Sequence, residues 1–135
     1  MSVDRLSDWR EPLAPDWRAQ ARALSAGLKA ASSDRPELAA TLRRLGGMRL
    51  GDGERLQLRR LVALARNSGG LPGFRSFRLM LVSNRTTSFF AADLEVAGVA
   101  RGLLIEAIET EYDSVGALAF NPAYRPAAGP FDAVL

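Results

Sequence analysis

The spacing of apolar residues predicts three helices in the first half of the chain. The first begins after the candidate N-cap Asp16 and ends at residues 32–33. The second opens with a capping-box pattern at Asp34 and stops at Gly46 and Gly47. The third is capped by Asp52 and closes at residues 67–70. The apolar residues expected to pack these helices into one unit are Trp17, Leu24, Leu28, Leu42, Leu45, Leu61 and Leu64.

The second half changes to short apolar runs of the kind found in buried strands. Residues 78–82 form one run, residues 103–109 form a second, and residues 131–135 look like the opening of a third. Between the first two, residues 89–97 fit a helix that ends at Gly98. This alternation of strand and helix predicts a parallel sheet with helices packed against it.

A turn cluster at residues 69–73 marks the best internal boundary. We therefore expect a helical region over residues 1–70 and an α/β region over residues 74–135. The predicted fold class is α/β, with an N-terminal helical bundle followed by a partial parallel sheet and its flanking helices. Because the chain stops inside an apolar run, we expect the sheet to be truncated there or covered by a second copy.

Composition limits the chemistry that these residues can perform. The chain has 135 residues, of which 47% are hydrophobic and 24% charged, as in an ordinary globular domain. It contains no cysteine and no histidine, which excludes zinc–thiolate sites and a Ser-His-Asp triad within these residues. The sequence suggests no cofactor. With no run of about 18 apolar residues and no apolar signal core at its start, we expect a cytoplasmic protein.

Basic residues are concentrated in the predicted helices. Residues 1–78 carry 15 basic and 8 acidic side chains, whereas residues 79–135 carry 3 and 7. A solvated face would explain these arginines, and so would a docking surface for an acidic partner, for which Arg55, Arg59 and Arg60 are the candidates. Nucleic acid is disfavoured as the partner because aromatic residues do not interleave with the arginines. The arginines of this stretch are Arg43, Arg44, Arg49, Arg55, Arg59, Arg60 and Arg66.

A polar turn follows the first predicted strand. Its candidate binding residues are Ser83, Asn84, Thr86 and Thr87, at the carboxyl end of the strand, where open parallel sheets bind ligands. Hydroxyls, an amide and the backbone N–H groups of the next helix could hold a phosphate, a carboxylate or an oxyanion there. The alternative is that these side chains only cap the helix.

Acidic residues gather at the end of the second predicted strand. Glu109 and Glu111 would share one face of a continued strand, with side chains about 7 Å apart. Such a cluster is typical of a polar strand end, and the alternative is a carboxylate pair for magnesium binding or acid–base work. The acids concerned are Glu106, Glu109, Glu111 and Asp113.

Residues 78–135 resemble the amino-terminal region of FkbH-like proteins, which join an SGNH-hydrolase-like domain to a haloacid-dehalogenase-type (HAD) phosphatase domain. The shared pattern is an apolar strand, then Ser83-Asn84 and the pair Thr86-Thr87, then a helix. Residues 111–113 resemble the family's acidic, tyrosine-containing segment, and residues 131–135 resemble its Pro-Asp-Val-Val-Leu strand. The resemblance implies an SGNH- or flavodoxin-like parallel sheet.

The resemblance also implies a role in polyketide-type biosynthesis. Family members transfer a glyceryl group to an acyl carrier protein, and the chemistry belongs to the HAD-type domain, whose Asp-x-Asp motif does not occur in this chain. We therefore expect a non-catalytic N-terminal part that helps to position a substrate bound to an acyl carrier protein. The partners would be that carrier protein and either a HAD-like domain outside these residues or a second copy. The alternatives are an SGNH-like esterase or acyltransferase completed by other residues, and an arginine-rich nucleic-acid-binding module.

Overall fold

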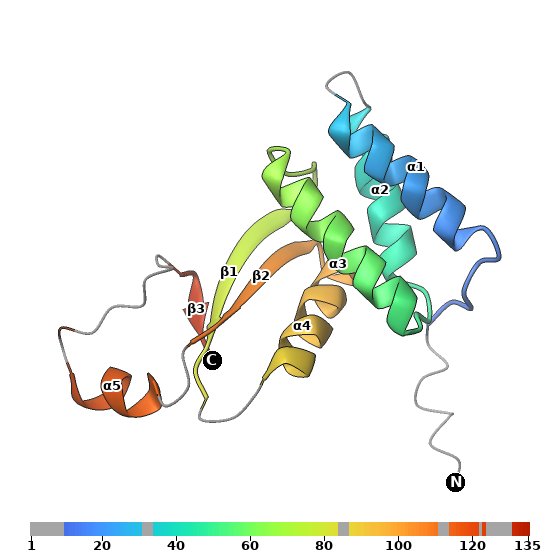
Figure 1. Ribbon diagram of the computed structural model, residues 1–135. Helices are drawn as coiled ribbons and strands as arrows, with labels where there is room; N and C mark the ends of the chain where they lie inside the picture. Colours follow the sequence, from blue (N-terminus) through green and yellow to red (C-terminus); the bar gives the residue numbers. More distant parts are fainter. Residues whose placement is uncertain (1–9, 31–33, 84–86, 111–113, 122, 124–130) are drawn as a thin grey trace, which may run out of the picture.

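The computed structural model describes residues 10–30, 34–83, 87–110, 114–121, 123 and 131–135 (Figure 1). Helices come first and a small sheet follows, which confirms the predicted mixed α/β class. Residues 114–120, for which the sequence predicts no regular element, are helical. In chain order the elements are α1 (Trp17–Lys29), α2 (Arg35–Gly46), α3 (Asp52–Asn67), β1 (Arg75–Leu81), α4 (Ser88–Ala100), β2 (Leu103–Glu109), α5 (Ser114–Phe120) and β3 (Ala133–Val134).

The three strands form one parallel sheet in the order β2-β1-β3. β1 pairs with β2 along its whole length, with Arg75 opposite Leu103 and Leu81 opposite Glu109. On its other side β1 pairs with β3, where Leu79 lies opposite Ala133. The predicted parallel pairing is therefore confirmed, and the order is the one in which flavodoxin-like doubly wound sheets begin.

Local sequence explains where the first helices start. The Asp34 side chain accepts a hydrogen bond from the Glu37 amide (3.4 Å), as the capping-box pattern predicts. The prediction that Asp52 caps α3 is wrong, because Gly51 holds the N-cap position and Asp52 is the first helical residue. Its carboxylate still favours the helix there, since a negative charge in the first turn complements the backbone dipole.

The prediction that α4 ends at Gly98 is also wrong. The helix continues to Ala100, and Gly102, whose φ is +73°, follows it before β2. Gly98 faces the sheet so closely that a Cβ atom would lie 2.7 Å from Ile105 Cδ1. Its lack of a side chain therefore serves helix–strand packing and not helix termination.

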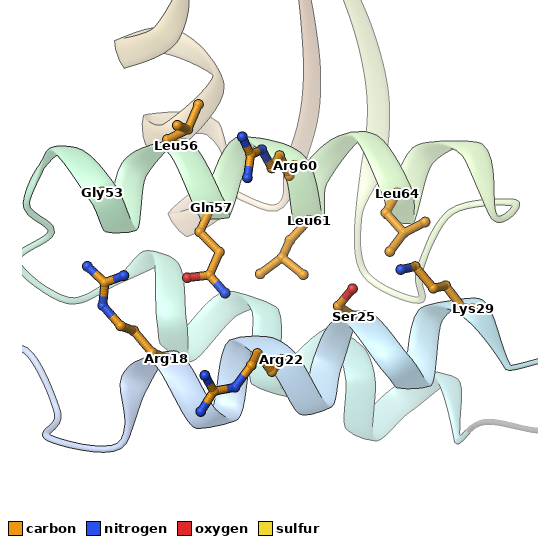
Figure 2. Close-up of a pocket in the computed structure, with 10 residues that line it drawn as sticks. All are labelled: Arg18, Arg22, Ser25, Lys29, Gly53, Leu56, Gln57, Arg60, Leu61 and Leu64. Carbon is orange, nitrogen blue, oxygen red and sulfur yellow. The ribbon is translucent and has the colours of Figure 1, made fainter.

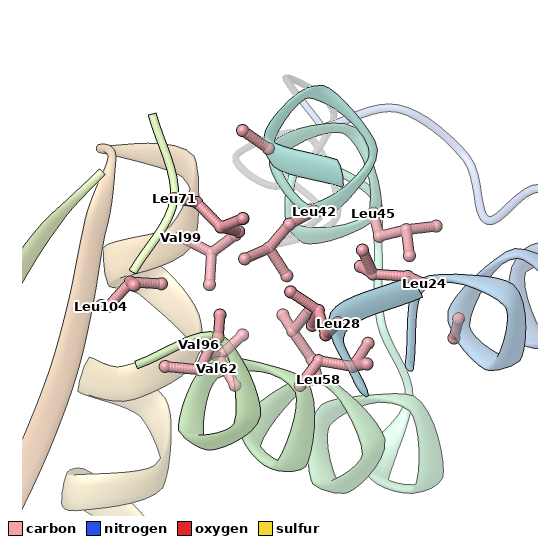
Figure 3. Close-up of a cluster of buried hydrophobic side chains, with 14 of the residues drawn as sticks. Leu24, Leu28, Leu42, Leu45, Leu58, Val62, Leu71, Val96, Val99 and Leu104 are labelled. Atoms are coloured by element: carbon pink, nitrogen blue, oxygen red, sulfur yellow. The ribbon is translucent and has the colours of Figure 1, made fainter. Parts of the chain in front are cut away.

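One apolar core crosses from the helices into the sheet layer (Figure 3). Six of the residues predicted to pack the helices are buried in it, and the seventh, Leu64, packs against it half-buried. The same core includes Val96 and Val99 of α4 and Leu104 of β2, so it extends past the turn at residues 69–73. A smaller cluster joins α4 to the sheet through Leu79, Leu81, Ala91 and Ile105. No helix among the described residues has both the length and the hydropathy needed to cross a bilayer.

We expect Gly46→Ala to destabilise the protein, although alanine is the better helix former by about 1 kcal/mol. Gly46 is buried in the last turn of α2, and a Cβ there would lie 2.4 Å from Val99 Cγ1 and 2.8 Å from Val99 Cβ. Val99 is fully buried and stiff at χ1, so the overlap should cost about 1–3 kcal/mol of unfolding free energy in urea titrations.

A double-mutant cycle tests the cause. Gly46→Ala should cost less in a Val99→Ala background, because the valine methyl groups are then absent. Gly116→Ala is the control, since no atom lies within 4 Å of a Cβ at that helical position. Equal losses with and without Val99 would refute the steric explanation.

Candidate functional site

At the polar turn after β1, the chain places one of its own carboxylates against the start of α4. The Thr87 amide donates to Glu109 Oε1 (3.0 Å), the Thr87 hydroxyl donates to the same oxygen, and the Ser88 hydroxyl donates to Oε2 (3.2 Å). Glu109 thus lies where the predicted anion would bind. Ser83 is half-buried after β1, while Asn84 and Thr86 lie outside the described residues.

These hydrogen bonds change the acidity of Glu109. The hydroxyl of Thr87 is the largest cause that lowers the pKa of Glu109 below its ordinary value. Loss of water contact acts in the opposite direction, and Ser88, the Thr87 amide and the charge of Arg59 add to the lowering. The lowered pKa keeps the carboxylate ionised further into the acidic range, where it continues to accept hydrogen bonds from the start of α4.

The acidic cluster predicted after β2 does not converge in the described structure. Glu106 and Glu109 are three positions apart on one strand and so face opposite sides of the sheet. Glu106 pairs with Arg66 (3.6 Å) and Arg78 (3.3 Å). Glu111 and Asp113 fall outside the described residues, and within those residues no group of three carboxylates is placed to hold a metal ion.

Two of the three predicted docking arginines are paired inside the molecule. Arg55 Nη1 lies 3.0 Å from Asp93 Oδ1, and Arg59 Nε lies 2.7 Å from Glu95 Oε2. Both pairs join α3 to α4. The charges of Arg55 and Arg59 are therefore largely neutralised by neighbours in the fold, and a partner would have to compete for them.

Glu95 has a second role at the outer edge of β2, which has no neighbouring strand among the described residues. Its other oxygen accepts a hydrogen bond from the Ala107 amide (3.0 Å), on the side of β2 that faces away from β1. An unpaired strand edge is a template for pairing with another chain, and proteins often cover such edges. Here Glu95 satisfies one amide of the edge, that of Ala107, and Arg59 holds Glu95 in place.

The remaining arginines of the predicted basic stretch, except Arg60, also have partners within the chain. Arg43 lies over the ring of Phe74, 5.1 Å from its centroid, and Arg44 donates to the side chain of Gln20 (2.8 Å). Arg49 donates to the carbonyl of residue 10, and Arg66 pairs with Glu106. Most of this stretch therefore stabilises the fold.

Arg60 instead lines a groove between α1 and α3 with a volume of about 630 Å³ (Figure 2). The two helices run side by side in the same direction, and Arg18 near the start of α1 pairs with Glu54 near the start of α3 (3.3 Å). All of the lining residues belong to these two helices: Arg18, Arg22, Ser25, Lys29, Gly53, Leu56, Gln57, Arg60, Leu61 and Leu64.

The groove is strongly cationic. Four of its lining residues are basic and none is acidic. Within the described part of the chain, Arg22, Lys29 and Arg60 have neither an ion-pair nor a hydrogen-bond partner. Like charges close together raise the local potential, so this groove attracts anionic groups more strongly than the paired arginines on α3.

Sequence reasoning missed the contribution of α1 to this site. Arg18 and Arg22 are four positions apart, and Lys29 follows seven positions later, which places all three on neighbouring rows of one helix face. That spacing was a usable signal. Its connection to Arg60 was not, because only the tertiary packing of α1 against α3 brings these residues together.

Comparison with models of known protein families, with curated proteins and with solved structures finds no match for this chain. The groove between α1 and α3 combines unpaired basic side chains with exposed apolar surface, and this combination is typical of binding sites.

We expect Glu95→Ala to lower the unfolding free energy by about 1–3 kcal/mol, because it leaves Arg59 and the Ala107 amide without their acceptor. The Ala107 amide should also exchange its hydrogen faster, as measured by NMR. Asp93→Ala is the matched control on the same helix. The Asp93 side chain is 62% exposed, so loss of its pair with Arg55 should cost less than about 1 kcal/mol. Similar losses for both variants would contradict the role of Glu95 at the strand edge.

We expect Thr87→Val to raise the pKa of Glu109 toward its ordinary value, because the hydroxyl donor is removed at nearly constant shape. A carboxyl NMR titration measures this, with Thr41→Val in α2 as the control. Since the folded-state pKa is lowered, Glu109 stabilises the fold above its unfolded-state pKa, and this contribution disappears as pH falls through the folded-state value. The stability difference between the wild type and Glu109→Gln should therefore shrink in acid, and a difference that grows in acid would reverse the assignment.

Proposed function

We propose that this chain is a cytoplasmic, non-catalytic docking module that binds an acidic acyl carrier protein. In an FkbH-like setting it would help to position a glyceryl or similar acyl group for transfer in polyketide-type biosynthesis. The observation that carries the proposal is the presence of three unpaired cations, Arg22, Lys29 and Arg60, around one groove without an acidic residue. Such a surface is complementary to an acidic protein.

The extent of the groove supports a macromolecular partner. Its lining residues run from Arg18 to Lys29 on α1 and from Gly53 to Leu64 on α3. No aromatic side chain is among them. Single-stranded nucleic acids are bound largely by stacking of bases on aromatic rings, so the lining favours an acidic protein over nucleic acid.

The catalytic step would belong to a HAD-like domain outside these residues. The esterase alternative has less support, because the helix start nearest to Ser83 already holds Glu109 and the chain contains no histidine to act as base. The proposal therefore assigns binding and positioning to this chain.

Binding of an acidic acyl carrier protein can be measured by titration with the full chain at about 50 mM and about 300 mM salt. We expect affinity to fall with salt, mainly through the association rate, because the Debye length shortens from about 14 Å to about 6 Å between these concentrations. The double variant Arg22→Glu, Arg60→Glu should bind at least about tenfold more weakly, since each exposed pair contributes up to about 1 kcal/mol and reversal adds repulsion.

The control is Arg75→Glu, Arg101→Glu, which makes the same change in net charge at two exposed positions outside the groove. Equal effects of the two double variants would show that only net charge matters, and the docking site would be rejected. Duplex or single-stranded DNA of similar charge serves as competitor. Tighter binding to DNA than to the carrier protein would replace the proposal with the nucleic-acid module.

A further inference from the structure

The groove has the shape of a trough that follows two parallel helices. Eleven positions separate Arg18 from Lys29 on α1, and eleven separate Gly53 from Leu64 on α3. At 1.5 Å per residue the lined part is about 16 Å long, or three helical turns. A ligand that used the whole trough would therefore be rod-shaped.

One helix of the fold, α2, already packs against the pair formed by α1 and α3. α2 lies behind α1 and α3 in Figure 2 and contributes no residue to the groove. It runs antiparallel to α1, because Trp17 Nε1 donates to the Leu45 carbonyl (3.1 Å) and Gly27 lies against Leu38. Thus one side of the α1–α3 pair carries a helix, while the opposite side forms the trough.

The floor of the trough is apolar and its margins are basic. Leu61 is buried and Leu64 is half-buried on the side of α3 that faces α1, whereas Leu56 is 49% exposed and lies at the outer margin, pointing away from α1 (Figure 2). Arg22 and Lys29 come from α1, and Arg60 comes from α3 (Figure 2). The complement of this arrangement is a helix with a stripe of apolar residues flanked by acids.

We infer that the trough binds one amphipathic, acidic helix of the partner, which completes a four-helix arrangement with α1, α2 and α3. The acyl carrier protein is named as the source of this helix on the strength of the proposed function. Apolar residues of the helix cover Leu56 and Leu64, and its carboxylates pair with Arg22, Lys29 and Arg60. This mode adds an apolar contact, which salt does not screen, to the electrostatic attraction.

The test uses two fluorescent peptides of about 18 residues, built from leucine, glutamate and alanine with blocked ends. In one, leucines recur at helical spacing with glutamates on both sides. In the other, the same residues are reordered so that leucines point in all directions. Net charge is identical, so a site that recognises charge alone binds both equally. We expect the amphipathic peptide to bind the full chain at least about tenfold more tightly, with a difference that persists at high salt.

Leu56→Gln should weaken binding of the amphipathic peptide about fivefold, because about half of the leucine surface is available for contact. Leu13→Gln is the matched control, since Leu13 is also an exposed leucine and does not line the trough. Both substitutions lie at exposed positions, and thermal unfolding checks that the fold is retained.

The outcomes separate this inference from the proposed function. Equal binding of the two peptides, or no effect of Leu56→Gln on either peptide or carrier protein, overturns the helix-binding trough even if the carrier protein binds through its charges. Discrimination between the peptides without any binding of carrier protein supports the trough and rejects the proposed partner.

Discussion

Helix α4 packs on two sides, against the sheet and against the first three helices, and this double contact joins the bundle to the sheet. Its remaining side is exposed: Asp93 and Ala97 lie there, and near its start Phe89 is 88% exposed. Ala91 and Leu94 pack toward the sheet, whereas Val96 and Val99 enter the core formed by the first three helices. Helix α4 therefore contributes to both apolar clusters and connects the core of the helical bundle to the sheet. The missing side chains of Gly46 and Gly98 allow the close contacts on its two sides.

The two acids within α4 determine what the arginines of α3 do. Asp93 pairs with Arg55 and Glu95 pairs with Arg59, and Glu95 also accepts a hydrogen bond from one amide on the outer edge of β2. The N-terminal half of the chain is net basic and the C-terminal half is net acidic. Where α3 meets α4 and β2, ion pairs between the two halves neutralise part of both charges. The unpaired cations remain on the other side of α3, where α1 adds its own. A basic stretch that looks uniform in the sequence is divided by folding into a structural part and an accessible part.

The sequence predicts the elements well because their periodicity is local. The bounds of β2 match the apolar run at residues 103–109, and the parallel pairing follows from the alternation of strand and helix. Errors arise where packing overrides a local signal, as at Gly98, which contacts Ile105, and at Asp52, which follows the true cap. The site was harder to predict because its members are far apart in sequence. Arg55, Arg59 and Arg60 have nearly identical local contexts, and only partners 36–38 positions away distinguish the first two from the third.

The parallel course of α1 and α3 gives the trough a direction. Both helices begin at the end marked by Arg18 and Gly53, so the positive ends of two backbone macrodipoles lie together there, and both negative ends lie near Lys29 and Leu64. Full side-chain charges act in the opposite sense. Asp52 and Glu54 lie in the first turn of α3, and Glu54 pairs with Arg18, whereas the cation Lys29 lies in the last turn of α1. The acids at the start of α3 and the lysine at the end of α1 therefore offset the backbone dipoles, and the attraction of the trough for anions is spread along its length.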